Sequence, residues 1–284
     1  MSPGTGTRPD VGSAAVAVLV AARPEEKVAR ARALAEDWRG GRLAFAFAAA
    51  PPADPARPAH PVLLPPGEMP RRRRAGSLKT RIALLHAIAH IEFNAIDLAA
   101  DIIARFGADM PRAFVDDWAR ICGEEAEHFA LLRARLQALG ADYGDLPAHA
   151  GLWQAARETA DDILARLVIV PLTLEARGLD VTPGMRERFA RAGDAESAAI
   201  LERILADEIG HVAAGRRWFL HVCAARGLNP AATYRRLLAE RFHGRLKPPF
   251  NRAARDAAGL PAAFYLDADP DGSTERPSSP QGAG

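Results

Sequence analysis

The chain has 284 residues, of which 25% are charged and 49% hydrophobic, so it can bury one sizeable core or two modest ones and is not disordered throughout. Lys and Arg number 37 against 35 Asp and Glu, and the formal charge of +2 excludes the global basicity that would itself indicate binding to nucleic acid or an anionic membrane. Cys122 and Cys223 provide neither a disulfide framework nor a paired thiol motif, which favours a cytoplasmic location.

An early apolar run, Ala14 to Ala22, has the length of a signal-peptide core. Arg8 is the only positive side chain before it and Asp10 lies between them, so we do not expect secretion. No run approaches the roughly 18 consecutive apolar residues of a transmembrane helix, and we expect no membrane-embedded segment.

Apolar residues recur three and four positions apart, and β-branched residues are scattered, which predicts an all-α fold. A first helical stretch covers about 14–38, and Pro24 can start its second part. Eight prolines between Pro51 and Pro70 then predict an extended linker, either a domain boundary or a strap laid over the core.

Four long helices follow, predicted at 78–106, 112–139, 152–177 and 195–226. Pro171 should bend the third, and shorter helices are expected at 184–192 and from Pro230 to about 242. Residues beyond 242 are expected to be irregular and those from about Asp267 disordered. The predicted organisation is an N-terminal helix and Pro-rich linker, a four-helix bundle, a C-terminal extension packed on the bundle and a disordered tail, at 1–76, 77–228, 229–266 and 267–284.

The four long helices each place a glutamate on an apolar stripe: Glu92, Glu125, Glu175 and Glu208. Two of these glutamates are followed three residues later by His128 and His211. One helical turn brings each carboxylate and imidazole to the same face, where both can reach one metal ion. A third pair with this spacing, Glu240 and His243, lies on a short terminal helix, and we interpret it as a coincidence.

The spacing of these residues repeats along the chain. Glu92 to Glu125 and Glu175 to Glu208 are both 33 residues apart, and the two histidines are 83 residues apart, as are the corresponding glutamates. In the first hairpin the two glutamates lie at similar distances from the turn near 107–111, so antiparallel packing should set them side by side. The second hairpin is less regular, because RGLDVTPG should interrupt the chain just after its first glutamate.

Several ionised carboxylates in an apolar bundle would each cost several kcal/mol of folding free energy unless cations balance them. One Glu from each of two helices, with Glu-x-x-His from each of the other two, is the di-iron or di-manganese carboxylate arrangement. Mixed oxygen and nitrogen ligands suit these metals, and we expect two iron ions, with manganese as the alternative. The competing hypothesis is that the glutamates form buried salt bridges with arginines such as Arg166 or Arg177.

The sequence also resembles a known family. The segments are HIEFNAIDLAAD (90–101), EEAEHFALLRARLQALGADYGD (124–145), PAHAGLW (147–153), VPLTLEARGLDVTP (170–183) and DEIGHVAAGRRWF (207–219). They resemble an uncharacterised bacterial family of the ferritin-like superfamily, a domain of unknown function, over roughly residues 24–265. The resemblance implies a ferritin-like four-helix bundle with a carboxylate-bridged di-iron centre. Its implied metal ligands are Glu92, Glu125, His128, Glu175, Glu208 and His211.

Other histidines and acids near this set have less certain roles. His86 and His90 lie on another side of their helix from the glutamate stripe, and ordinary surface or interhelix roles are expected. His149, in a predicted loop, either caps the next helix or contacts the site. Asp207 lies one turn before His211 and either orients its imidazole or is exposed to solvent.

Four further features have mainly structural interpretations. Trp118 and Trp218 share faces with the predicted ligands and are expected to pack in the core, as is Cys122. The run Arg71 to Arg74 could grip phosphates, but a short charge run beside a proline linker is usually solvated, so we do not expect a nucleic-acid partner.

The residues together predict a non-haem di-iron oxidoreductase that uses O₂ or peroxide on an unidentified substrate, with an electron-donor protein as a candidate partner. One alternative is an iron-handling protein that oxidises Fe²⁺ for storage or detoxification. A second is an enzyme similar to a tRNA-modifying hydroxylase, and a third is a binding module with a structural metal. The segments on both sides of the bundle favour an enzyme over a minimal storage cage.

Overall fold

The computed structural model describes residues 8–65, 68, 76–149 and 151–266, and these are mainly helical, which confirms the all-α prediction. Two strands of two residues each, β1 (Leu63–Leu64) and β2 (Ala148–His149), form a short parallel ladder. The run Arg71 to Arg74 and the predicted tail 267–284 lie outside the described residues.

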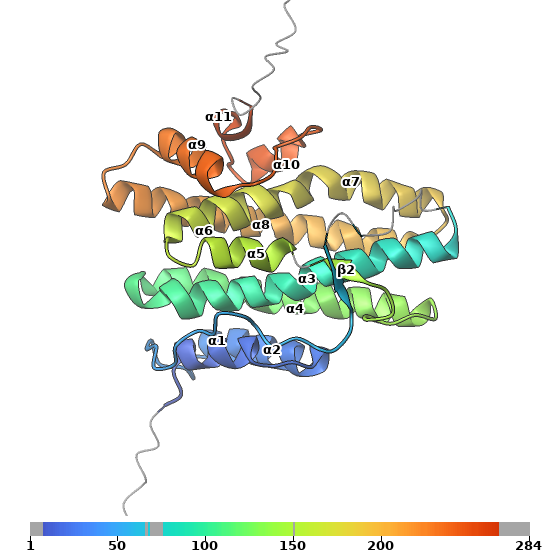
Figure 1. Cartoon of the computed structure of the whole chain (residues 1–284), viewed down its shortest axis with the longest axis horizontal. Coiled ribbons are helices and arrows are strands. Elements are labelled where there is room, and N and C mark those ends of the chain that lie inside the picture. Colours follow the sequence, from blue (N-terminus) through green and yellow to red (C-terminus); the bar gives the residue numbers. More distant parts are fainter. Residues whose placement is uncertain (1–7, 66–67, 69–75, 150, 267–284) are drawn as a thin grey trace, which may run out of the picture.

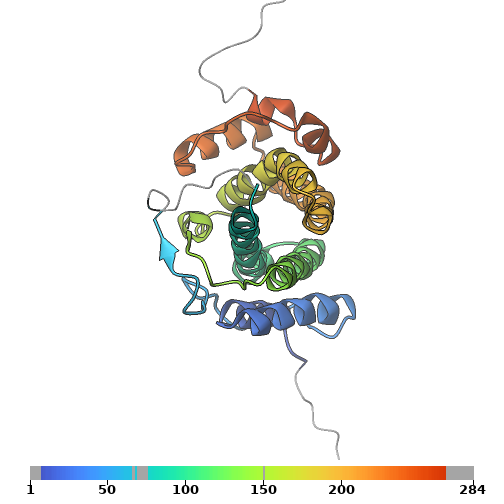
Figure 2. The same ribbon diagram turned by 90° about the vertical axis from the view of Figure 1, so that its right-hand side faces the viewer.

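Four long helices form the centre of the molecule: α3 (Leu78–Phe106), α4 (Arg112–Ala138), α7 (Ala176–Arg191) and α8 (Ala195–Ala225). They lie side by side in two antiparallel hairpins, seen end-on in Figure 2. The first hairpin turns through η2 (Gly107–Asp109). Ser77 caps α3 in a reciprocal capping box with Thr80, and Asp194 caps α8 through its side chain, so these helices begin where local sequence predicts.

Helix α3 is long and apolar enough, by length and composition alone, to cross a membrane. However, 72% of its most apolar window is buried against other parts of the fold, which is the pattern of a core helix. Its burial therefore accounts for its apolar character.

The prediction of one bent helix over 152–177 was wrong. The segment forms α5 (Gly151–Glu158), α6 (Ile163–Ile169) and the π-helix η3 (Val170–Glu175), and η3 continues directly into α7. Side chains make the break after α5, because the Thr159 hydroxyl donates to the Ala155 carbonyl and Asp162 caps the first turn of α6. The expected short helix at 184–192 is the second half of α7.

Helix α7 continues through the segment that the sequence predicts to be an interruption. Pro183 lies inside it and has no N–H to donate to the carbonyl of Leu179, one turn earlier. The Asn251 side-chain amide, which lies far along the chain, donates to that carbonyl at 3.0 Å. This tertiary hydrogen bond replaces the missing helical one, which explains why the proline does not break the helix.

The N-terminal segment packs on one side of the central helices as α1 (Val11–Leu19) and α2 (Pro24–Arg39). Lys27 of α2 forms a fully buried ion pair with Asp97 of α3 and also donates to the Val18 carbonyl at 3.0 Å. The Pro-rich segment then runs as a strap that β1 ties to β2.

The C-terminal segment covers the opposite side (Figures 1 and 2) as α9 (Pro230–Arg241), α10 (Arg252–Ala257) and α11 (Ala262–Tyr265). The expectation of irregular structure beyond residue 242 was wrong for α10 and α11. The buried Arg255 guanidinium donates to both carboxylate oxygens of Asp180 in α7, at 2.9 and 2.7 Å, and this contact, remote in sequence, anchors the extension.

Candidate metal centre

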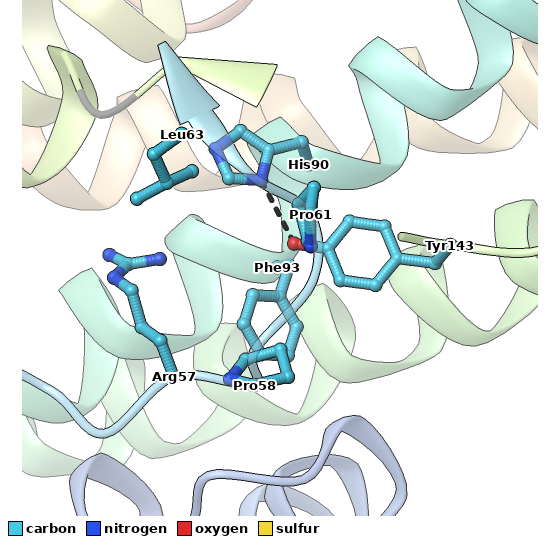
Figure 3. Close-up of a pocket in the computed structure, with 7 residues that line it drawn as sticks. All are labelled: Arg57, Pro58, Pro61, Leu63, His90, Phe93 and Tyr143. Atoms are coloured by element: carbon cyan, nitrogen blue, oxygen red, sulfur yellow. Dashed lines mark hydrogen bonds between the residues drawn. The ribbon is translucent and has the colours of Figure 1, made fainter. Parts of the chain in front are cut away.

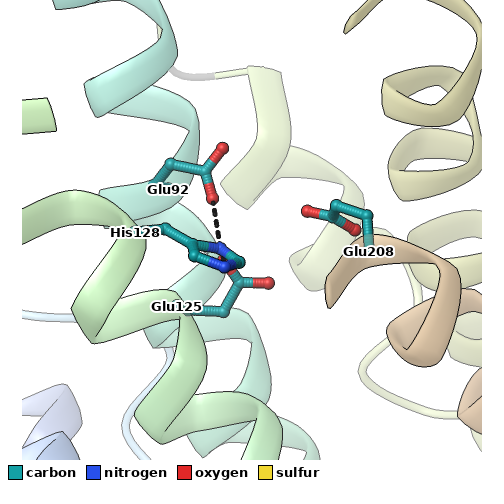
Figure 4. Close-up of side chains that lie close together, drawn as sticks. All are labelled: Glu92, Glu125, His128 and Glu208. Atoms are coloured by element: carbon teal, nitrogen blue, oxygen red, sulfur yellow. Dashed lines mark ion pairs between the residues drawn. The ribbon is translucent and has the colours of Figure 1, made fainter. Parts of the chain in front are cut away.

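The predicted ligands come from four helical segments that surround one point in the centre of the molecule. Glu92 lies on α3, Glu125 and His128 on α4, Glu175 at the end of η3, and Glu208 and His211 on α8. Figure 4 shows the side chains of Glu92, Glu125 and His128 facing Glu208 across the interior. The structure therefore brings together residues up to 119 positions apart in the sequence, from Glu92 to His211.

Four of these residues form a tight group. One potential ligand atom from each of Glu92, Glu125, His128 and Glu208 lies within 4.8 Å of the others, and all four residues are buried. Such a group could hold a metal ion.

The second histidine joins this group through Glu125. One carboxylate oxygen of Glu125 lies 3.4 Å from His128 Nδ1, and its other oxygen lies 3.0 Å from His211 Nδ1. His128 Nδ1 is 3.3 Å from Glu92 Oε2, and His211 Nδ1 is 3.5 Å from Glu208 Oε2. Glu125 thus lies between two sites, each with one histidine and one further glutamate.

The atoms that face the centre make no hydrogen bonds within the described part of the chain. They include both Glu125 oxygens, both histidine Nδ1 atoms and one oxygen of each other glutamate. Buried polar atoms without partners are rare in folded proteins and costly, yet here they belong to all six predicted ligands. This donor set, four carboxylates and two imidazoles, fits a pair of divalent metal ions.

The other nitrogen of each histidine is held by a carboxylate from the opposite helix. His128 Nε2 on α4 lies 3.0 Å from Asp207 Oδ2 on α8, and His211 Nε2 on α8 lies 2.9 Å from Glu124 Oε2 on α4. A carboxylate on one nitrogen fixes the ring orientation and leaves Nδ1 to face a metal. Asp207 was expected beside His211 on its own helix, and that expectation was wrong, because the contact crosses between helices.

Glu124 was not predicted, although a signal for it exists. Glu124 and Asp207 are 83 residues apart, the same offset as the two histidines, and so are Arg120 and Arg203, which pair with these carboxylates one turn earlier. The sequences RICGEEAEH and RILADEIGH are therefore equivalent parts of an internal repeat. The repeat includes the residues that orient the imidazoles as well as those that face the centre.

The electrostatics of the cluster show how strongly it demands cations. Burial raises the pKa of Glu92 to about 8, helped by the nearby Glu125 carboxylate, and burial with the surrounding carboxylates raises the pKa of Glu175 well above its usual value. Burial alone would lower the pKa of His128, but Glu125 and Glu92 raise it to about 11. Without metal, the cluster must therefore hold protons to limit repulsion among its carboxylates.

The π-helix η3 positions Glu175 at the end of its wider turn, and π-turns often occur at functional sites. Its close packing on α8 depends on Gly215. A Cβ atom at this position would lie 2.4 Å from Cβ of Pro171, so only glycine permits this approach. The sequence signal for Glu175 was its 83-residue partner, whereas the π-helix was not predicted.

The salt-bridge alternative does not describe these glutamates. Arg166 pairs with Asp101, which also binds Arg105, and Arg177 lies 3.5 Å from Asp180. Neither arginine is an ion-pair partner of the glutamates in the described residues. The carboxylates face histidines and one another instead.

The remaining candidate residues support the core. Trp118 and Cys122 are buried, and the nearly buried Trp218 donates from its indole N–H to Asp117 at 2.7 Å. His149 accepts from the Gly151 N–H at 3.2 Å through Nδ1, which matches the expected capping role.

His90 lies outside the cluster, as expected, and belongs to a different polar group (Figure 3). Its Nε2 donates to the His149 carbonyl at 2.8 Å, so Nδ1 accepts from the Tyr143 hydroxyl at 2.9 Å. A pocket beside this pair has an empty volume of about 200 Å³ and is lined by Arg57, Pro58, Pro61, Leu63, His90, Phe93 and Tyr143. Burial lowers the pKa of His90 to about 4, so the imidazole is neutral and joins α3 to the loop and strap.

Fold and site define an all-helical protein with a buried carboxylate and histidine cluster that could hold a metal ion. Residues 20–266 match the family described as Protein of unknown function (DUF455), and the chain belongs to this family. It is similar to a protein of Haemophilus influenzae described as an uncharacterized protein, with 44% identity over 211 residues, 72% of this chain and 73% of that protein. No solved structure matches the chain.

Proposed function

We propose that the protein is a di-iron oxidoreductase of the ferritin-like superfamily, which uses O₂ or peroxide to oxidise a substrate. The observation that carries this proposal is the set of unpaired, inward-facing atoms on all six predicted ligands. A structural ion-pair network would satisfy these atoms, whereas a metal pair needs them free.

Each residue has a distinct role in this proposal. Glu125 lies between the two histidines and would bridge the metals, while Glu92 and Glu208 would each bind beside one histidine. Glu175 supplies a further carboxylate from η3. Asp207 and Glu124 hold the imidazoles in position and increase their basicity.

Two iron ions would supply one-electron redox steps and a site for O₂ or peroxide. The protein contributes a dry interior, since Glu125 and both histidines are at most 1% exposed. Exclusion of water strengthens electrostatic interactions within the site and protects reactive species from side reactions. Manganese fits the same donor set, and metal analysis separates the two.

An iron-handling role would use the same six residues. The enzyme is favoured because helices α1 and α2 cover one side of the central helices and α9 to α11 cover the opposite side (Figure 2). Those sides are therefore unavailable for packing of the central helices into a shell. The same covering supports an enzyme that acts on an organic substrate, including one similar to a tRNA-modifying hydroxylase.

The test is an anaerobic Fe²⁺ titration followed by mixing with O₂. We expect two ions per chain, one rapid oxidation and an oxo-bridged absorption band, without continued iron uptake. Glu125→Ala with Glu208→Ala should abolish binding, whereas Glu240→Ala, in the third Glu-x-x-His pair on α9, should leave it unchanged. Continued uptake into large particles would instead establish iron storage, and no bound metal would refute both roles.

A further inference from the structure

The C-terminal extension carries a charge opposite to that of the rest of the chain. Residues 229–266 contain seven Lys and Arg against two Asp and Glu, a net charge of +5. Since the whole chain carries +2, the remaining residues carry −3. Such a local excess of positive charge steers acidic partners toward one side of a molecule.

Three of these cations project from the segment between α9 and α10 and the first residue of α10. Arg245, Lys247 and Arg252 are exposed and have no ion-pair partner among the described residues. Arginines on the central helices differ, since Arg186, for example, pairs with Glu202 and Arg217 with Asp117. We call Arg245, Lys247 and Arg252 the C-terminal basic surface.

The backbone that carries this surface is held against α7. The Arg177 guanidinium donates to the carbonyls of Lys247 and Pro249 at 2.7 and 3.2 Å, and the Asn251 N–H donates to Asp180 at 2.9 Å. Folding therefore fixes this backbone, so a partner that binds the three side chains need not order the chain as well.

The same contacts place the surface next to the metal centre. Arg177 is only two residues beyond Glu175, and Arg255 donates to the carbonyl of the intervening Ala176 at 3.4 Å. The segment that bears the basic surface thus packs on the turn of α7 that directly follows a predicted metal ligand (Figure 1).

We propose that the C-terminal basic surface docks an acidic electron-donor protein. This inference rests on the proposed function, which requires electrons from outside the chain. The described residues hold one candidate metal group, and both cysteines are buried. A one-electron donor would dock twice to reduce two ferric ions to ferrous ions, and would itself be oxidised by one electron each time. Redox partners typically form small, charge-steered and transient contacts, which suit three exposed cations on a fixed segment.

The test compares the full-length protein with the triple variant Arg245→Glu, Lys247→Glu, Arg252→Glu. A matched control reverses three exposed cations on other helices, Arg39→Glu, Lys79→Glu and Arg188→Glu, which also have no printed partner among the described residues. The probes are a plant-type [2Fe–2S] ferredoxin and a flavodoxin, both acidic, with binding measured by calorimetry at low and high salt. Circular dichroism verifies that each variant is folded.

We expect salt-sensitive binding of at least one probe, weakened about tenfold or more in the triple variant and less than about threefold in the control. Equal binding by the two variants, or no binding of either probe to the unaltered protein, would overturn the inference, as would a single-stranded RNA that occupies this surface more tightly than both probes. Reduction of the iron-loaded protein by dithionite bypasses docking. Failure of that reaction would count against the proposed function, and a normal reaction in the triple variant locates its defect at docking.

Discussion

Metal binding should release protons, and the structure sets how many. With a pKa of about 8, Glu92 is about nine-tenths protonated at pH 7, and His128, with a pKa of about 11, is almost fully protonated. Both groups must lose their protons to bind metal. These two residues alone should therefore release about two protons, and because protons compete with metal, affinity should rise about a hundredfold per pH unit below pH 8.

Calorimetry with Mn²⁺, which avoids reaction with O₂, measures this release in two pH 7 buffers of different ionisation enthalpy. The variant Glu92→Gln removes one titrating group, so its proton release should fall by about one. Release of fewer than one proton by the unaltered protein, or an affinity that does not change between pH 6 and 8, would refute the reasoning about this cluster.

Three further predictions concern residues around the centre. Asp207→Ala removes the partner of one imidazole and should weaken metal binding about 10- to 100-fold in a competition titration, and an unchanged affinity would contradict its orienting role. Gly215→Ala should lower the free energy of unfolding by about 1 to 3 kcal/mol in urea despite the better helix propensity of alanine, because the new Cβ meets Pro171; a stabilised variant would disprove this close contact. Lys27→Met leaves buried Asp97 without its cation and should cost about 3 to 5 kcal/mol in the same assay, with a loss below 1 kcal/mol counting against a buried ion pair.

The first central hairpin could be predicted closely from local signals. The Ser77 cap and Pro111 mark where its two helices begin, and the observed bounds agree with those predicted. The second hairpin could not, because its deciding contacts are remote. Asn251 replaces the hydrogen bond that Pro183 cannot make, and Gly215 admits the close approach of η3. Local pattern carries no information about either contact.

The candidate ligands were predictable because their spacing repeats. Residues that must meet at one point in equivalent halves retain a constant offset, even where the helix between them changes, as at Glu175. The orienting acids were harder to recognise, since Glu124 and Asp207 are partly exposed and resemble ordinary surface residues on their own helices. Only their packing across helices reveals which imidazole each one holds.

The most direct measurement is a crystal structure of the iron-loaded protein with anomalous scattering recorded at the iron edge. We predict two peaks per chain, both enclosed by the six carboxylate and imidazole side chains, with Glu125 in contact with each. Peaks elsewhere, or a centre whose side chains bond only to one another, would contradict the proposal.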